Sequence, residues 1–205
     1  MSERPFSQAC ENNQDAILEI LREELRGVDA VLELGSGTGQ HASYFASELA
    51  QLQWQPTDLP ENHVGIEAWR ESCGAQNLLP VRELDVRSID WGMDIPGAIF
   101  TANTFHIMAW EAVEDLFAYL GQYAPTRNRL CVYGPFNYRG NYTSDSNARF
   151  DQWLASQNPH SALRDFERGD GLARPAGFRL QADHGMPANN RLLVWHKLSM
   201  VTASA

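Results

Sequence analysis

The sequence is short of positive charge. Lys197 is its only lysine, and 16 lysine and arginine residues stand against 26 acidic residues, so the formal net charge is −10 at pH 7. DNA and RNA are bound through a cationic surface that neutralises their phosphates. We therefore expect no nucleic acid among the partners of this protein.

Cysteines and long apolar runs are also scarce. Cys10, Cys73 and Cys131 form no Cys-x-x-Cys pair, which argues against a disulfide framework and a zinc site, and no metal is expected. No apolar run approaches the ~18 residues of a membrane-spanning helix, and no secretory signal core is present. We expect a cytoplasmic protein without a membrane partner, folded as one domain over residues 1–205.

The most informative segment is a glycine-rich turn between an apolar run and an amphipathic pattern. The run Ala30–Leu34 predicts a buried strand, the turn carries Gly35, Gly37 and Gly39, and the pattern over 40–50 predicts a helix. A turn of this kind brings backbone N–H groups close to a nucleotide-like ligand.

The spacing of the turn distinguishes two classes of nucleotide site. A dinucleotide fingerprint, G-x-G-x-x-G, requires a glycine at the position where this chain has Gln40. Glu33 precedes the turn, and a carboxylate at the end of a buried strand is costly without a partner or a ligand. G-x-G-x-G after an acid resembles motif I of the class I S-adenosylmethionine (SAM) methyltransferases. A glycine turn alone is also compatible with another nucleotide or with no ligand.

Two further acids follow the next two predicted strands. Asp58 ends a strand predicted at 52–58, where an open α/β sheet places the carboxylate that binds a ribose diol. Asp85 ends a strand predicted at 78–86, where the class I methyltransferases hold the adenine amino group, although a helix cap is an equal alternative there. Because the carboxyl ends of parallel strands meet at one edge, these acids are expected to lie near Glu33.

The rest of the chain alternates strands and helices. The remaining predicted elements are helices over 7–25, 62–73 and 111–123, strands over 97–102, 130–133, 178–184 and 191–197, and an irregular insertion over about 134–176 with a helix near 145–157. This order predicts an α/β fold with a Rossmann-like, seven-stranded, mostly parallel sheet. Helices cover both of its faces, and the C-terminal hairpin supplies one antiparallel strand.

Several further stretches resemble one family within this fold, that of methyltransferase-like 26. The matching pieces are Glu11–Asn13, Leu32–His41, Trp54–Asp58, Asn103–Ile107, Tyr133–Phe136, Ser146–Asn147, Phe150–Asp151, Leu163–Asp165 and Met186–Asn190. Together they run from about residue 4 to residue 197, which is nearly the whole chain.

The resemblance implies SAM as the cofactor and leaves the substrate unnamed. The cofactor-binding residues that it implies are Glu33, Gly35, Gly37, Gly39, Asp58, Asp85 and Asn103. The substrate-side residues are Asn12, Phe136, Arg164, Asn189 and Asn190, with Arg4 and Glu11–Asn13 folding over the pocket. The stretch Asn103–His106 differs from the Asp/Asn-Pro-Pro-aromatic motif of enzymes that methylate bases or glutamine amides, so those targets are not expected.

Two histidines are candidates for a general base. Methyl transfer requires alignment of the acceptor and, for a hydroxyl or thiol, removal of a proton. His106 follows the fourth strand at the ligand edge, and its ordinary pKa suits the task, although a structural role is an equal alternative. His184 ends the penultimate strand, beside the Asn189–Asn190 turn, and is the second candidate.

The insertion is rich in arginine. Its arginines are Arg139, Arg149, Arg164, Arg168 and Arg174. One or two of them could clamp a carboxylate or phosphate, but a solvated face paired with nearby acids is the favoured interpretation.

The sequence as a whole therefore predicts a SAM-dependent methyltransferase that acts on a small molecule. A SAM-binding interaction module without catalysis is an alternative from another class. A nicotinamide-dependent oxidoreductase is a weaker alternative, because Gln40 interrupts its fingerprint and no Tyr-x-x-x-Lys pair is present. The oligomeric state is left open.

Overall fold

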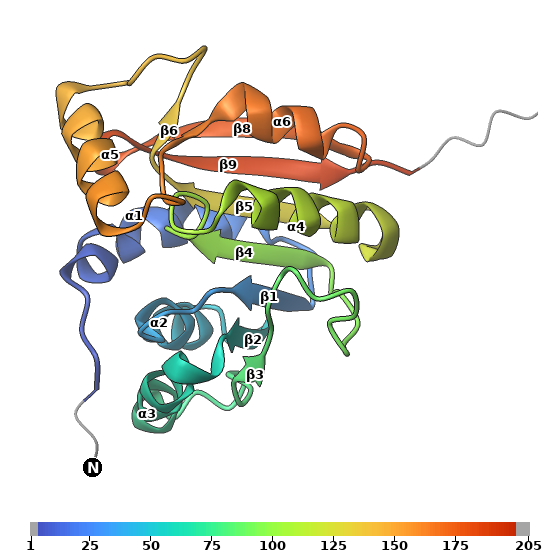
Figure 1. The fold of residues 1–205 in the computed structure, drawn as a ribbon. Helices are drawn as coiled ribbons and strands as arrows, with labels where there is room; N and C mark the ends of the chain where they lie inside the picture. The colour runs from blue at the N-terminus through green and yellow to red at the C-terminus, as the bar shows by residue number, and fades with distance from the viewer. Residues whose placement is uncertain (1–3, 200–205) are drawn as a thin grey trace, which may run out of the picture.

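The computed structural model describes residues 4–199 and has a seven-stranded sheet at its centre (Figure 1). The first part of the chain forms α1 (Gln8–Glu24), β1 (Ala30–Leu34), α2 (Gln40–Glu48), β2 (Gln53–Asp58), the 3-10 turn η1 (Pro60–Asn62), α3 (His63–Cys73) and β3 (Arg82–Glu83). The second part forms β4 (Ala98–Ala102), α4 (Trp110–Tyr123), β5 (Arg129–Gly134), β6 (Phe136–Asn137), α5 (Asp145–Gln157), β7 (Arg164–Asp165), α6 (Phe166–Ala173), β8 (Phe178–Met186), η2 (Pro187–Asn189) and β9 (Asn190–Lys197).

The strands lie in the order β3-β2-β1-β4-β5-β9-β8. β1 pairs in parallel with β2 and with β4, and β4 pairs in parallel with β5. β9 runs antiparallel to both of its neighbours, β5 and β8. The predicted fold, a mostly parallel sheet with one antiparallel strand from the C-terminal hairpin, is confirmed.

Two apolar layers cover the sheet, as the alternation of side chains along β1 shows. Successive strand residues point to opposite faces. Val31 packs with Leu21 of α1 and Phe45 of α2, whereas Leu32 and Leu34 belong to the layer formed with α4 and α6. Helices therefore lie on both faces, as predicted.

The third strand is shorter than the sequence pattern indicated. A strand was expected over 78–86, but only Arg82 and Glu83 form β3, beside the end of β2. Leu78 makes an isolated bridge to Trp54, and Pro80, which has no N–H to donate, separates the two pairings. The result is a short edge strand followed by an open loop.

The segment 134–176 contains one helix more than expected. α5 has the predicted bounds, and α6 follows it and packs in the layer with α4 through Ala173 and Phe166. α6 is only 8 residues long and includes Gly169 and Gly171, which weaken a helical sequence pattern.

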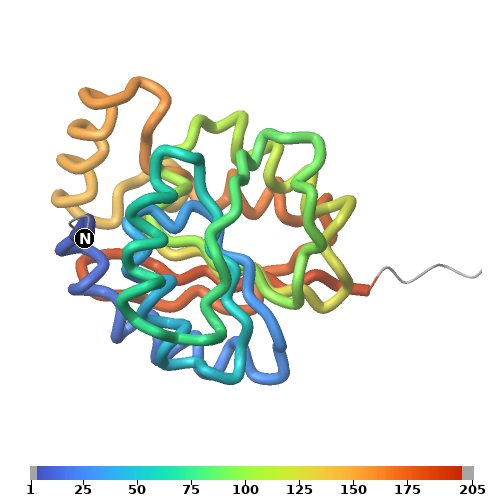
Figure 2. Tube along the Cα trace, turned by 90° about the horizontal axis from the view of Figure 1, so that it is seen from below, coloured from blue at the N-terminus to red at the C-terminus, as the bar shows by residue number. Residues whose placement is uncertain are grey.

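The carboxyl ends of the parallel strands meet at one edge of the sheet. In Figure 1 this is the left-hand edge, and the start of α1 and the whole of α5 lie beyond it. Figure 2, turned by 90°, again shows the N-terminal segment beside α5. Two segments far apart in sequence thus flank the edge where α/β sheets bind ligands.

No helix within residues 4–199 is long and apolar enough to cross a membrane. The same residues bring together no group of three or more histidine, cysteine, aspartate or glutamate side chains that could hold a metal ion.

Candidate functional site

A cavity of about 1170 Å³ opens at the carboxyl edge of the sheet. Ligand pockets usually measure roughly 300–1,000 Å³, so this cavity has room for two small molecules side by side. The cavity has two ends of different character. The charged end is formed by residues 35–38, 58–59, 62 and 84–87, and the aromatic end by residues 103–109, 146–147, 150, 153 and 187–190.

The glycine turn forms one wall of the charged end. Gly37 has φ +56°, and a Cβ at this position would meet no heavy atom within 4 Å, so the turn presents bare backbone to open space. Gly39 has φ +86° and serves a different purpose, because a Cβ there would lie 2.7 Å from Ile66 Cα. Gly35 and Gly37 line the cavity, whereas Gly39 permits the close approach of α3 to α2.

Asp58 closes the charged end from β2. Its Oδ2 accepts a hydrogen bond from the Gly37 N–H (2.7 Å), and its Oδ1 accepts from the Leu59 N–H (2.7 Å) and from Asn62 Nδ2 (2.9 Å). The carboxylate therefore fixes the glycine turn against the loop after β2. Two carboxylate oxygens offer about four acceptor sites, so capacity for a ligand hydroxyl is left.

Asp85 lies in the loop after β3 and lines the same end. Its carboxylate accepts from Arg87 Nε (3.0 Å) and Arg87 Nη2 (2.6 Å), and these bonds lower the pKa of Asp85. Leu84 and Val86 flank it and also line the cavity. The loop thus combines an acid with two apolar walls.

Glu33 is placed beneath the turn, and it is not among the residues that line the cavity. Its side chain is buried, and Oε2 accepts a hydrogen bond from Trp54 Nε1 (2.9 Å). Burial raises the pKa of Glu33 to about 7, and the nearby Asp58 carboxylate adds to the rise. Glu33 therefore supports the turn from within the core.

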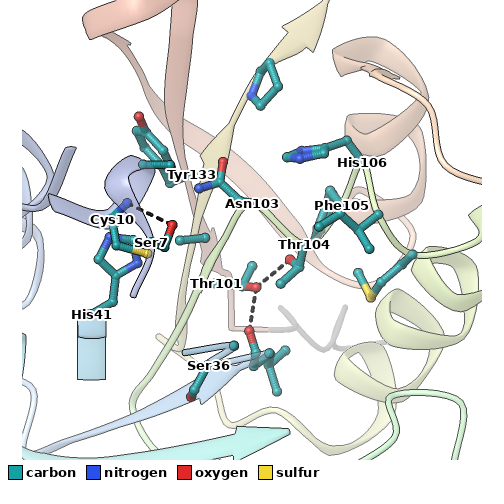
Figure 3. A pocket seen from close by; sticks show the side chains of 18 of the residues that line it. Ser7, Cys10, Ser36, His41, Thr101, Asn103, Thr104, Phe105, His106 and Tyr133 are labelled. Carbon is teal, nitrogen blue, oxygen red and sulfur yellow. Dashed lines mark hydrogen bonds between the residues drawn. The ribbon is translucent and has the colours of Figure 1, made fainter. Parts of the chain in front are cut away.

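The loop after β4 connects the two ends of the cavity (Figure 3). Thr101 Oγ1 donates to the Leu34 carbonyl (2.7 Å) and lies 2.6 Å from Thr104 Oγ1, which ties this loop to the turn after β1. Asn103 follows with φ +59°, and its backbone N–H donates to the Tyr133 carbonyl (2.8 Å). Asn103 is therefore held at the junction.

His106 lines the aromatic end, as predicted from its position after β4. A Cβ on Gly134 would lie 3.5 Å from His106 Nδ1 and 3.9 Å from Asn103 Oδ1, so the imidazole and the amide face the same space. Burial lowers the pKa of His106 to about 4, and the Arg164 charge adds to this effect. The imidazole is therefore neutral at pH 7 and a weaker base than the sequence suggested.

His184 lies outside the cavity. β8 continues past it to Met186, and its Nε2 is 3.4 Å from Glu24 Oε1 at the end of α1. The side chain therefore faces the helix that covers the sheet, and the structure does not bring it to the predicted substrate side.

Arg164 and Phe136 are also outside the cavity. The Arg164 guanidinium donates to the carbonyls of Phe105 (2.9 Å) and His160 (2.8 Å), and also to that of Met108. It therefore clamps the loop that carries His106. Phe136 is buried in the core beside Phe105. Both residues support the aromatic end from behind.

The remaining substrate-side residues are brought together. Asn12 lines the cavity from the first turns of α1, and Asn189 and Asn190 line it from the β8–β9 turn. The Asn189 carbonyl accepts from Asn147 Nδ2 (3.3 Å), and this bond joins the turn to α5.

Sequence reasoning missed the contact that positions the N-terminal segment. The Ser7 N–H donates to Gln40 Oε1 (2.5 Å), and Gln40 Nε2 donates to the Ser7 carbonyl (3.4 Å). Gln40 therefore anchors the start of α1 over the glycine turn. Asn13 Oδ1 lies 2.7 Å from His41 Nε2, a second link between the two helices. The resemblance had implied this arrangement for Glu11–Asn13 and for Arg4, but the Arg4 guanidinium lies over the Trp69 ring (4.5 Å) and donates to Ser72 Oγ (2.7 Å), outside the cavity.

α5 supplies the aromatic side chains that were also missed. Phe150 and Trp153 line the cavity, and their rings stack with centroids 5.8 Å apart. The spacing of three residues places them on one face of a helix. The sequence predicted the helix correctly and gave no indication of what that face would meet.

The fold is similar to solved methyltransferase structures. An O-methyltransferase family protein from Burkholderia thailandensis aligns with a TM-score of 0.77 at 14% identity, over 91% of this chain and 59% of that chain. An O-methyltransferase family 2 protein from Planctomyces limnophilus, solved with apigenin, aligns with a TM-score of 0.82 at 16% identity, over 93% and 58%. Human N-acetylserotonin methyltransferase, solved with SAM, aligns with a TM-score of 0.72 at 15% identity, over 92% and 55%.

These alignments establish a common fold, that of the class I methyltransferases, at low sequence identity. The present chain spans less than two thirds of the length of each of those three chains. A family profile described as "Protein of unknown function (DUF938)" matches residues 4–197. The chain therefore belongs to the DUF938 family.

Proposed function

We propose that this protein is a SAM-dependent methyltransferase that acts on a small molecule, and that its family is that of methyltransferase-like 26. The observation that carries the proposal is the charged end of the cavity. There, the backbone of Gly37 faces open space beside the Asp58 carboxylate, and the cavity continues into a second compartment.

The residues present fit the cofactor. Ser36 Oγ is buried at the glycine turn, lines the cavity and has no hydrogen-bond partner within residues 4–199. A buried polar atom of this kind is costly unless a ligand satisfies it. Ser36 and Gly37 would hold the methionine part, Asp58 a ribose hydroxyl, and Asp85 with Leu84 the adenine.

SAM would supply a sulfonium methyl group, which passes to a lone pair of the acceptor while the carbon–sulfur bond breaks and a neutral thioether leaves. This chain's residues have to align the acceptor and exclude water. Asn103 and His106 both line the cavity, in the loop after β4. For a hydroxyl or thiol acceptor, the neutral His106 imidazole takes the proton. An amine that arrives deprotonated requires only orientation.

Calorimetry with SAM, S-adenosylhomocysteine and NAD tests the proposal. We expect the first two to bind and NAD not to bind. Gly37→Ala is the matched variant, because its Cβ would project into the cavity while no protein atom lies within 4 Å. It should lose binding and keep the fold. Tight NAD binding without a response to the other two ligands would overturn the proposal.

A SAM-binding module without catalysis is the alternative from another class. Cofactor binding and methyl transfer use different residues, so binding alone does not separate the two. Conversion of SAM to S-adenosylhomocysteine in the presence of a pool of small metabolites does separate them. An active enzyme gives turnover that depends on the pool, whereas a binding module gives none.

A further inference from the structure

The charges that line the cavity are confined to one end. Within residues 4–199, the charged side chains of the lining are Asp58, Asp85 and Arg87, and all three follow β2 or β3. Arg87 is paired with Asp85. The aromatic end therefore has no side chain of its own that could neutralise a charged ligand.

The arginines of the neighbouring segment face elsewhere. Arg164 is held by backbone carbonyls, Arg168 lies over the Trp110 ring at 4.1 Å, and Arg174 pairs with Asp170 at 2.7 Å. Arg139 and Arg149, the other two arginines of the segment, are not among the residues that line the cavity. The carboxylate or phosphate clamp considered from the sequence is therefore not part of the cavity lining.

Flat apolar surfaces form the walls of the aromatic end. The Phe150 ring stacks on Trp153 and meets the His106 ring edge to face at 5.5 Å. Trp153 and Ile107 line the cavity although 54% and 56% of their surfaces are exposed. Large apolar side chains left exposed beside a pocket are characteristic of a binding surface.

The polar groups of the aromatic end are neutral. Asn103, Asn189 and Asn190 contribute amides, which donate and accept hydrogen bonds without charge. The His106 imidazole is uncharged at pH 7 because burial lowers its pKa to about 4. This set orients a hydroxyl, carbonyl or N–H group on a ligand and offers no ion pair.

We propose that the aromatic end binds an uncharged, planar aromatic molecule that carries a polar group directed at Asn103 and His106. This inference rests on the proposed function in taking that molecule to be the methyl acceptor. Moving a charge from water into an apolar site without a partner is strongly unfavourable. The aromatic end therefore selects against substrates that would place a carboxylate, a phosphate or an ammonium group within it.

A matched set of naphthalenes tests the selection. In the presence of saturating S-adenosylhomocysteine, the dissociation constants of 2-naphthol, 6-hydroxy-2-naphthoate and 6-(aminomethyl)-2-naphthol are measured at pH 7 by calorimetry. We expect 2-naphthol to bind at least about tenfold more tightly than either charged analogue. Phe150→Ala should weaken 2-naphthol binding by about tenfold and leave the affinity for S-adenosylhomocysteine unchanged.

Two variants with the same substitution locate the effect. Ile107→Arg adds a cation at the exposed rim of the aromatic end, and it should narrow the preference for 2-naphthol over the naphthoate by about threefold or more. Ile89→Arg is the control, because Ile89 is 92% exposed and is not among the residues that line the cavity. This control should behave as the parent protein does.

The outcomes separate this inference from the proposed function. If S-adenosylhomocysteine binds while the naphthoate binds as tightly as 2-naphthol, or while no naphthalene binds, the inference is wrong and the cofactor site stands. If S-adenosylhomocysteine fails to bind, the proposed function is wrong. Titrations of the three naphthalenes without S-adenosylhomocysteine then show whether the cavity by itself prefers the uncharged ligand.

Discussion

The two ends of the cavity are built in different ways. The charged end consists of short turns that directly follow β1, β2 and β3, and each of its key residues lies at or just after a strand end. The aromatic end gathers the loop after β4, a face of α5 and the turn between β8 and β9. The charged end is thus local in sequence, whereas the aromatic end depends on segments spread over residues 103–190.

The two ends also differ in how their shape is maintained. In the charged end, Asp58 accepts hydrogen bonds from the turn that it faces, so residues of the site stabilise each other. In the aromatic end, Arg164 holds the His106 loop from outside the cavity. Changes at the charged end should therefore act on cofactor binding and, where they disturb the turn, on stability, whereas changes inside the aromatic end should act on acceptor binding and turnover.

Gly39→Ala should have the largest effect of the variants considered, and we expect that effect on stability. The new Cβ would lie 2.7 Å from Ile66 Cα, at a φ of +86°. Left-handed backbone costs about 1–2 kcal/mol for a residue with a side chain, and overpacking costs about 1–3 kcal/mol. We expect the free energy of unfolding in urea to fall by about 2–5 kcal/mol.

Gly37→Ala is the control for this prediction. Its φ is +56°, and no heavy atom lies within 4 Å of the new Cβ. It should lose only about 1–2 kcal/mol of stability. Equal losses in the two variants would mean that the contact between α2 and α3 does not require glycine.

Much of the fold and of the charged end could be predicted from the sequence for one reason. In a parallel sheet, the residue that ends a strand lies at the ligand edge, so Asp58 was placed correctly from its position in the chain alone. Glu33, the penultimate residue of β1, does not line the cavity, because its side chain is buried beneath the turn and accepts a hydrogen bond from Trp54 Nε1. Side-chain direction depends on packing, which the strand pattern does not specify.

The aromatic end could be predicted only in part. Asn103 and His106 follow a strand and both line the cavity, although Asn103 was expected on the cofactor side. Phe150 lies on a helix that leaves the sheet, and its position follows from tertiary contacts. Arg164 was assigned to the substrate side through the family resemblance. Its guanidinium instead donates hydrogen bonds to three backbone carbonyls of nearby loops. The sequence alone does not show which carbonyls require a side-chain donor.

The pH dependence of stability tests the position of Glu33. Its pKa is raised to about 7 in the folded protein, so the folded state keeps a proton that the unfolded chain releases. The stability from this proton is fully present below the unfolded pKa and is lost as the pH rises towards 7. Relative to Glu33→Gln, the parent should lose about 2–3 kcal/mol of unfolding free energy between pH 5 and 8.

The comparison with Glu33→Gln cancels the contribution of other titrating groups to the pH dependence of stability. Burial lowers the pKa of His41 and of His106 to about 4, so both contribute stability that is lost as the pH falls below their unfolded values. That opposite trend is present in both proteins and cancels in the difference. A difference that does not vary with pH would show that Glu33 is ionised throughout this range.

His106→Ala should reduce turnover and leave the charged end unaffected. A general base contributes about 10²–10⁴-fold, and the low pKa of His106 favours the lower limit, so we expect kcat to fall by about 10²-fold for a hydroxyl acceptor. The dissociation constant for SAM should stay the same. Equal turnover in variant and parent from pH 6 to 9 would remove His106 from the chemistry and leave Asn103 as the orienting group.

Asp58→Asn should have the smallest effect, and it connects the two roles of the charged end. The amide keeps the shape of the side chain and one acceptor oxygen, so the bond to the Leu59 N–H or to the Gly37 N–H can persist. Loss of the charge removes charge-assisted bonding to the ribose, and we expect SAM to bind about tenfold more weakly by calorimetry.

The unfolding free energy, measured in urea without ligand, shows separately whether the substitution disturbs the glycine turn. If the loss of affinity arose from a disordered turn, Asp58→Asn would lose stability in proportion to affinity. If Asp58 contacts the ligand directly, affinity falls while the unfolding free energy changes by less than about 1 kcal/mol, and an unchanged dissociation constant would exclude Asp58 from the cofactor site.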